Sequence, residues 1–308
     1  MLPYVPSVKR SPHIALLTAN ALLGANFSFY ASLYESGIEF SEIFLIQIIA
    51  GASLFIPFAA ILPPRPYKKM RLEDFGTIFT IGLIILFGWL YLLTQGASLT
   101  NPIDASTLST VGPIVTLIIA YATKAEKPNK LHFAATAIAL IGALTMLIDR
   151  RTKFGGSSTI HIGDAMVAIS VVAAAIHTTL ARQQTRRYGA LVVIAIYFAV
   201  GIVVTLPVLW CDFLILMERL TSPAINVDIL YITLFGTILP LWLLYTSSSV
   251  VSSSVAASYR YAQPLTAIVM TIIRGQANPD DATILGMILI IFGVILLGLA
   301  NERRSISV

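Results

Sequence analysis

The sequence predicts an all-α membrane protein with ten transmembrane helices, arranged as two inverted five-helix repeats around a central cavity. Of its 308 residues, 57% are hydrophobic and only 11% are charged, and the mean hydropathy is +0.85. Long apolar segments divide the chain, and its second half aligns with the first at a constant offset. A soluble domain carries about 25% charged residues, so this chain has too few charges to cover a water-facing surface.

Each apolar segment is long enough to cross a bilayer as a helix, which takes roughly 20 mostly apolar residues. Charged or Pro- and Gly-rich stretches such as "LPPRPYKKMR" separate most of them, and "SSSVVSSS" separates the eighth from the ninth. The first segment is too long for a signal-peptide core and has no small-residue cleavage site, so we expect it to remain as a membrane helix. The segments are 13–34, 42–62, 73–95, 103–123, 130–148, 162–182, 190–211, 227–249, 252–273 and 281–300.

The positive charges in the loops predict the orientation, because Lys and Arg collect on the cytoplasmic side of a membrane protein. With the N-terminus inside, 14 of the 20 Lys and Arg residues fall in cytoplasmic segments and five fall in outside loops. The run Arg150, Arg151 and Lys153 is a local exception. We therefore expect a multi-pass protein of the cell (inner or plasma) membrane with both termini cytoplasmic. The net charge of +5 is spread over short loops, which argues against nucleic-acid binding.

The second half of the chain repeats the first at an offset of 151 residues. Five is an odd number of helices, so the second repeat must enter the membrane from the opposite side. Inverted repeats of this kind recur in secondary transporters, whose substrate sites lie near the bilayer midplane between the halves. The alignment predicts two repeats, 1–150 and 151–308, and favours transport over a purely structural bundle. The aligned pairs include Pro113 with Pro264, Gly142 with Gly293, and Asn26 with His177.

Four segments also resemble a known family: "ANALLGANFSF" (19–29), "STLSTVGPIVTLIIAYATKAEK" (106–127), "HFAATAIALIGALTML" (132–147) and the stretch 254–297. Through them the chain is similar, over nearly its whole length, to the EamA-type branch of the drug/metabolite transporter superfamily. The resemblance implies ten helices around a central cavity and the export of amino acids or other small metabolites. Two features depart from the family pattern: Gln47 stands where many members carry arginine, and "RGQ" (274–276) replaces the usual "GE".

Arg260 lies about eight residues into the ninth apolar segment, which is roughly 12 Å deep at 1.5 Å per residue. Facing lipid at that depth, it would cost about 2.5–3.5 kcal/mol, so we expect it to face the bundle interior or a hydrated cavity. Two roles remain open. Its planar guanidinium could bind a carboxylate or phosphate of a solute. It could instead bind backbone carbonyl groups freed by Pro264 or belonging to a facing helix.

Pro113 and Pro264 predict bends at matching places in the two repeats. Proline has no N–H group and clashes with the carbonyl group four residues earlier, which for Pro264 belongs to Arg260. Irregular backbone at membrane depth is tolerated where it is buried in protein or lines a water-filled cavity. We interpret the two bends as bordering a cavity, although ordinary proline kinks are common in membrane helices.

Polar and aromatic residues at helical spacing predict the walls of that cavity. Gln263 follows Arg260 on the same helix face and adds amide donors and an acceptor. An aromatic residue taken alone could equally pack in the core or lie at the membrane interface. Taken together, the set fits a cavity with aromatic walls and few polar groups. The predicted substrate-binding residues are Asn26, Tyr30, Tyr91, Gln95, His177, Trp242, Tyr245, Tyr259, Arg260 and Gln263.

His177 lies near the middle of its segment, where a histidine could couple proton movement to transport. A lone buried histidine is, however, more often neutral and hydrogen-bonded. No Asp or Glu lies deep in a predicted span, so the acidic relay of a strong proton-driven pump is missing from the sequence. Facilitated or weakly coupled transport is therefore the favoured interpretation.

The residue types that other functions need are scarce. Cys211 is the single cysteine, and the longest acidic runs, Glu73-Asp74 and Asp280-Asp281, lie at predicted helix starts. We therefore expect no metal, no cofactor and no enzymatic activity. The predicted function is export, by alternating access, of an amino acid or a related zwitterionic or anionic solute. A membrane-embedded enzyme and an efflux carrier for cationic or aromatic compounds are the alternatives. The expected partners are the solute and the lipid bilayer, with the protein a monomer or a weak homodimer.

Overall fold

The computed structural model describes residues 12–61, 70–100, 102–122, 130–153, 162–219, 226–251, 253–276 and 281–306. These residues form helices joined by short turns and contain no strand, so the predicted all-helical fold is confirmed. Seven helices of this described part are long and apolar enough to cross a membrane, and two further apolar helices are shorter. The number of ten crossings therefore stays a prediction.

The helices follow the predicted segments closely, and π-helical or 3-10 turns interrupt four of them. In chain order the elements are α1 (Pro12–Glu35), α2 (Phe40–Ile61), α3 (Leu72–Leu83), the π-helix η2 (Ile84–Tyr91), α4 (Leu92–Ser98), α5 (Pro102–Leu108), the 3-10 turn η3 (Ser109–Val111), α6 (Gly112–Ala122), α7 (Lys130–Lys153), α8 (Ile162–Tyr188), α9 (Ala190–Val208), α10 (Trp210–Arg219), α11 (Asn226–Thr233), the π-helix η5 (Leu234–Ile238), α12 (Leu239–Ser248), α13 (Ser253–Ser258), the 3-10 turn η6 (Tyr259–Tyr261), α14 (Ala262–Ile273) and α15 (Asp281–Ile306). The separate short helix α10 was not predicted.

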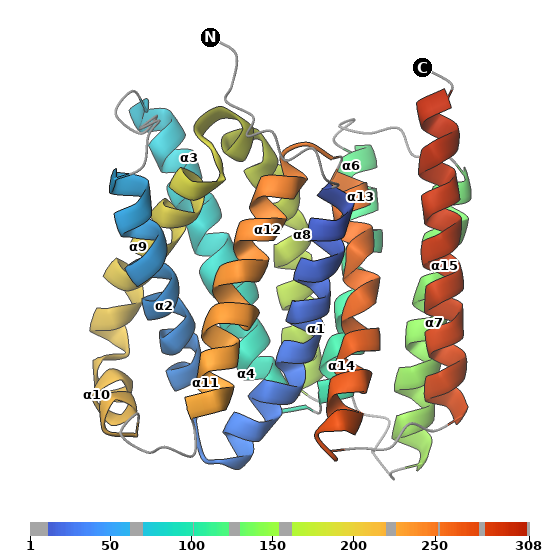
Figure 1. Cartoon of the computed structure of the whole chain (residues 1–308), viewed down its shortest axis with the longest axis horizontal. Coiled ribbons are helices and arrows are strands. Elements are labelled where there is room, and N and C mark those ends of the chain that lie inside the picture. The colour runs from blue at the N-terminus through green and yellow to red at the C-terminus, as the bar shows by residue number, and fades with distance from the viewer. Residues whose placement is uncertain are drawn as a thin grey trace.

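The helices run side by side, and α1 begins at the end of the bundle where α15 ends (Figure 1). We call this the terminal end and the other the opposite end. Helix α8 ends at the terminal end, because Arg187 and Tyr188 bond there to Asp74 near the start of α3, at 2.7 and 2.6 Å. The first helices of the two halves, α1 and α8, therefore start at different ends of the bundle.

Large apolar side chains cover the outside of the bundle. Val203, Val208 and Ile273 are each more than 70% exposed, and many other Ile, Leu and Phe side chains are exposed with them. Exposed apolar patches of this extent are rare on soluble monomers but suit contact with lipid. The surface thus agrees with a multi-pass membrane protein.

Helices α7 and α15 pack against each other as an antiparallel pair at one side of the bundle (Figure 1). A Cβ atom on Gly142 of α7 would lie 2.7 Å from the carbonyl oxygen of Gly286 in α15. A Cβ atom on Gly293 of α15 would lie 2.8 Å from the carbonyl oxygen of Ala135 in α7. At the offset of 151, Gly142 corresponds to Gly293 and Ala135 to Gly286. The contact is therefore reciprocal, and small residues allow the two backbones to approach closely.

The predicted boundary between the repeats, at residues 150/151, falls in the last turn of α7. Half of the 14 charges assigned to cytoplasmic segments, including those in 62–69 and 123–129, lie outside the described residues. Glu126, at the end of one of the family-like segments, lies outside them as well.

Candidate functional site

A pocket lies among α1, α2, η2, α8, α9, α12 and the segment from α13 to α14. At the terminal end its lining reaches Ser248, the last residue of α12. Toward the opposite end its lining in α1 stops at Tyr30, five residues before that helix ends at Glu35. The pocket therefore extends toward the terminal end and stops short of the opposite end.

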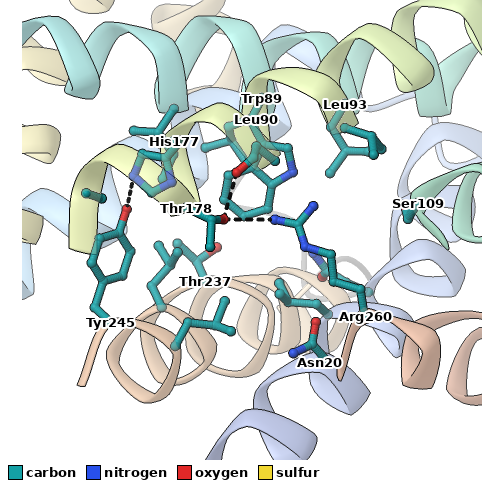
Figure 2. A pocket seen from close by; sticks show the side chains of 18 of the residues that line it. Asn20, Trp89, Leu90, Leu93, Ser109, His177, Thr178, Thr237, Tyr245 and Arg260 are labelled. Carbon is teal, nitrogen blue, oxygen red and sulfur yellow. Dashed lines mark hydrogen bonds between the residues drawn. The ribbon is translucent and has the colours of Figure 1, made fainter. Parts of the chain in front are cut away.

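Arg260 projects into this pocket from the 3-10 turn η6 (Figure 2). Its side chain is partly exposed, and its Nη2 donates only a long hydrogen bond, 3.4 Å, to Oγ1 of Thr178. A Cβ atom on Gly112 would lie 2.9 Å from Nη1, so glycine at that position leaves room for the guanidinium. Arg182 also lines the pocket, whereas no Asp or Glu among the described residues does. The described lining therefore includes two arginines and no carboxylate.

The two 3-10 turns explain how Arg260 comes to face the pocket. Ser109 and Arg260 each begin or lie within such a turn, and each stands four residues before a proline, Pro113 or Pro264. Proline cannot donate a hydrogen bond to the carbonyl group four residues earlier, so the α-helical pattern breaks there. Both carbonyl oxygens instead accept bonds from nearby backbone N–H groups. Ser109 and Arg260 both line the pocket, and they correspond at the offset of 151.

His177 forms a compact aromatic cluster on the pocket wall with Tyr197 and Tyr245. Its Nε2 is 2.6 Å from the hydroxyl oxygen of Tyr245 (Figure 2). The three rings pack edge to face, with centroids 5.5 to 5.9 Å apart. The Tyr197 hydroxyl is buried and has no hydrogen-bond partner. The cluster thus holds His177 in place and leaves one buried hydroxyl unsatisfied.

Amide groups on three helices complete the polar part of the lining. Gln263 Nε2 donates to Oδ1 of Asn20 at 2.9 Å. The Tyr30 hydroxyl donates to Oε1 of Gln47 at 3.2 Å, and Gln47 Nε2 donates to the hydroxyl of Thr237 at 2.9 Å. These bonds fix the positions of most of the amide groups around the pocket.

Asn26 differs from the other lining amides, because its Oδ1 is buried without a hydrogen-bond partner. This oxygen packs so closely against Gly236 that a Cβ atom there would overlap with it. An unpartnered buried acceptor is unusual in a folded protein, so Asn26 is a candidate contact for a ligand.

The pocket brings together six of the ten predicted substrate-binding residues, and four lie elsewhere. Tyr91 packs edge-on against Phe40 and Phe44. Gln95 does not line the pocket, and Trp242 is 39% exposed. The Tyr259 hydroxyl is 2.7 Å from Nδ1 of His13. Whether any of the ten binds substrate stays a prediction. The six that line the pocket are Asn26, Tyr30, His177, Tyr245, Arg260 and Gln263.

Sequence reasoning missed several lining residues, among them Asn20, Gln47, Trp89, Arg182 and Tyr197. Two polar residues among these had a usable signal, since Asn20 and Gln47 interrupt apolar segments. Arg182 was counted as a loop charge, but α8 continues to Tyr188 and places it inside the helix. A π-helix has a wider turn than an α-helix, so the face that η2 presents does not follow the usual spacing.

Polar and aromatic contacts join α1, α11 and the end of α14 at the opposite end. Arg274 donates two hydrogen bonds to the Asp228 carboxylate, at 2.9 and 3.1 Å. The Ser32 hydroxyl donates to the same carboxylate at 2.5 Å. The rings of Phe29 and Tyr231 stack with centroids 3.6 Å apart, and the Arg274 guanidinium lies over Phe29. We call Ser32, Phe29, Asp228, Tyr231 and Arg274 the closing network.

Comparisons with known proteins agree with this architecture. The EamA-like transporter family matches residues 10–148 and again residues 161–299. The chain belongs to this family. An EamA-like transporter is a membrane transporter, and the two matched segments, like the aligned prolines, are offset by 151 residues (161 − 10 and 299 − 148). The two-repeat architecture is thereby confirmed.

The fold of this EamA-like transporter also occurs among solved structures, of which 29 chains are similar. One of these, titled "Crystal structure of protein", has a TM-score of 0.71 and 15% sequence identity, and the match covers 95% of this chain and 98% of the other. At that identity the similarity shows the fold alone. A comparison with curated proteins gave no match. In the part of the chain that the structure describes, no group of three or more His, Cys, Asp or Glu residues could hold a metal ion.

Proposed function

We propose that this EamA-like transporter is a carrier that moves a small solute with a negatively charged group, such as an amino acid or a related anion. One observation supports this proposal above the others. The Arg260 guanidinium faces the pocket, and its one hydrogen bond, to Thr178, is long. Desolvating a charge is costly unless it is paired, and a guanidinium suits a carboxylate or phosphate group. A solute with such a group would supply the missing partner.

Alternating access is the proposed mechanism, and the difference between the two ends of the bundle supports it. The pocket extends toward the terminal end, whereas the closing network joins helices at the opposite end. In the proposed cycle, solute enters from the terminal end. The closing network then opens while the terminal end closes. The distribution of loop charges favours a cytoplasmic terminal end, so the proposed direction is export across the cell membrane.

Transport into liposomes that contain the purified protein tests this proposal. We expect saturable counterflow of at least one radiolabelled solute from a panel of small carboxylates, phosphates and amino acids, and at least tenfold slower counterflow of that solute with Arg260→Gln. Arg186→Gln is the matched control, because Arg186 is exposed on α8, does not line the pocket, and loses the same charge. Chemical turnover without flux would indicate an enzyme. Saturable flux of aromatic cations that does not depend on Arg260 would indicate a drug-efflux carrier.

The orientation needs a separate measurement. Tags at the two chain ends should both be protected from protease in intact cells and digested after permeabilisation. Tags that are digested on different sides of the membrane would exclude the proposed arrangement.

A further inference from the structure

We infer that the solute is a net organic anion with an apolar body, and not a zwitterion; this inference rests on the proposed function. A zwitterionic amino acid brings an ammonium group as well as a carboxylate into the site. Burying a charged group is costly unless the protein pairs it. The described lining offers Arg260 to the carboxylate but no Asp or Glu to the ammonium.

The neutral acceptors around the pocket do not replace a carboxylate, because none of them carries a negative charge and several are already occupied. Asn20 Oδ1 accepts from Gln263, and Gln47 Oε1 accepts from Tyr30. The carbonyl oxygens of Ser109 and Arg260 accept backbone N–H groups. An ammonium group has three donors. Among the lining amides, Oδ1 of Asn26 is buried without a partner and Gln263 uses only its Nε2, so neutral oxygens could accept some of these N–H groups but could not neutralise the charge.

The pocket also repels an ammonium group electrostatically. Arg260 lines it, and its guanidinium group remains protonated at physiological pH. Like charges that share a site of low dielectric interact strongly. A solute with a single negative group meets attraction only, whereas the cationic part of a zwitterion meets repulsion.

Apolar side chains next to Arg260 indicate the body of the solute. Figure 2 shows Arg260 reaching toward Thr178, with Trp89, Leu90 and Leu93 nearby on the neighbouring wall. Most of the remaining lining is also aliphatic or aromatic. A charged head near Arg260 and an aliphatic or aromatic body along η2 and α4 would match these two parts of the lining. The head is a carboxylate or a phosphate, because both suit a guanidinium.

Solutes that share one body and differ only in charge test the inference. One series is 3-phenylpropanoate, phenylalanine and phenethylamine; a second is 4-methylpentanoate, leucine and isopentylamine. Binding to the full-length protein in detergent is measured by titration calorimetry. We expect the anion of at least one series to bind at least tenfold more tightly than its zwitterion, and the amine to bind most weakly. 2-Phenylethyl phosphate, measured alongside, distinguishes a phosphate head from a carboxylate head.

The variants add a second requirement. Arg260→Gln should weaken binding of the anion at least tenfold, Arg260→Lys should restore part of it, and Arg186→Gln should leave it unchanged. The inference is overturned if a zwitterion binds as tightly as its anion or if no anion binds. It is also overturned if Arg260→Gln leaves the affinity for the anion unchanged. Tight zwitterion binding that depends on Arg260 would leave the proposed carrier function standing. The ranking of solutes on the unmodified protein does not depend on whether a variant folds.

Discussion

At the 3-10 turn before Pro264 the second repeat presents Arg260 to the pocket, whereas the first repeat presents Ser109 at the equivalent turn before Pro113. The backbone feature is duplicated, but the charge is not. His177 likewise occupies the position that Asn26 occupies in the first repeat. The two repeats thus share a backbone arrangement, but the charged Arg260 and the titratable His177 come from the second repeat alone.

The two repeats also differ at the closing network. Asp228 and Arg274 of the closing network correspond to residues 77 and 123, which are both threonine in the sequence. Thr77 bonds only to the carbonyl oxygen of Glu73 in its own helix, and Thr123 lies outside the described residues. Because the repeats run in opposite senses, the position of Thr77 belongs to the terminal end. The Asp228–Arg274 ion pair thus has a neutral counterpart in the first repeat, and a different ion pair, Asp74–Arg187, joins α3 to α8 at the terminal end.

The largest expected effect is on stability, at the reciprocal glycines of α7 and α15. This contact is one in which the two repeats are alike. We expect Gly142→Ala and Gly293→Ala to destabilise the protein by similar amounts, roughly 1–3 kcal/mol each, because each new methyl group overpacks against a neighbouring backbone. Thermal unfolding in detergent, followed by circular dichroism, measures both. Gly76→Ala is the control, since a Cβ atom there meets nothing within 4 Å. A large loss for one glycine and none for the other would contradict the reciprocal contact.

Asp228→Asn should weaken the closing network and make the second repeat more like the first. Removing the charge leaves Arg274 without its ion-pair partner. We expect the fraction of molecules that are open at the opposite end to rise roughly tenfold, which corresponds to a change of about 1.4 kcal/mol in the free energy of opening. The measurement is the labelling rate of a cysteine introduced at Tyr34, with Cys211 replaced by serine. Asp212→Asn is the matched control, because Asp212 bonds to Ser41 outside this network. An unchanged labelling rate would mean that the network does not hold this end closed.

His177→Asn gives the two repeats the same residue at this position. The substitution removes the hydrogen bond to Tyr245, and a neutral hydrogen bond contributes about 0.5–1.5 kcal/mol, so we expect flux to fall several-fold. We also expect the pH dependence of flux between about pH 5.5 and 8 to stay unchanged. The reason is that His177 is buried with its Nε2 bonded to Tyr245, and burial disfavours the charged imidazolium. His13→Asn controls for a titratable residue outside the pocket, and a pH dependence that only His177→Asn abolishes would show proton coupling through His177.

Gly112→Ala has the smallest expected effect and tests the position of Arg260 rather than its charge. The added methyl group would lie 2.9 Å from Nη1, so the flexible end of the arginine must shift. We expect the affinity for an anionic solute to fall about two- to fivefold, since charge-assisted hydrogen bonds depend on geometry. Gly88→Ala, which also meets a close neighbour but away from Arg260, should leave the affinity unchanged. Equal losses in both variants would point to a general packing effect.

Much of the fold could be predicted because its signals are local. Segment lengths gave helices such as α1 and α2 to within a few residues, and the prolines and glycines of the repeat gave the offset of 151 that the family match also shows. The aligned glycines Gly142 and Gly293 both lie in the contact between α7 and α15. Their alignment did not predict this contact, because spacing alone does not reveal which helix a glycine faces. Which residue fits at a tertiary contact depends on the residues packed against it, and those residues are distant in sequence.

The site was predictable only in part, for two physical reasons. Arg260 and Gln263 stand out because polar groups in an apolar helix need a protein or water partner. Tyr91 was predicted as an aromatic wall residue at helical spacing to Gln95, but the π-helix η2 presents Trp89 and Leu90 to the pocket instead. Such a turn has no reliable sequence signature.

The reciprocal contact between α7 and α15 also bears on the history of the chain. Because the same surface of each helix packs against the other, the interface is self-complementary. An ancestral chain of half this length would therefore have carried both sides of this interface. Two copies inserted in opposite senses could then dimerise through it, as isologous interfaces allow. In such a dimer, any arginine at the position of Arg260 would have occurred twice around one hollow. In a single polypeptide the two positions can differ, so one repeat carries Arg260 and the other Ser109.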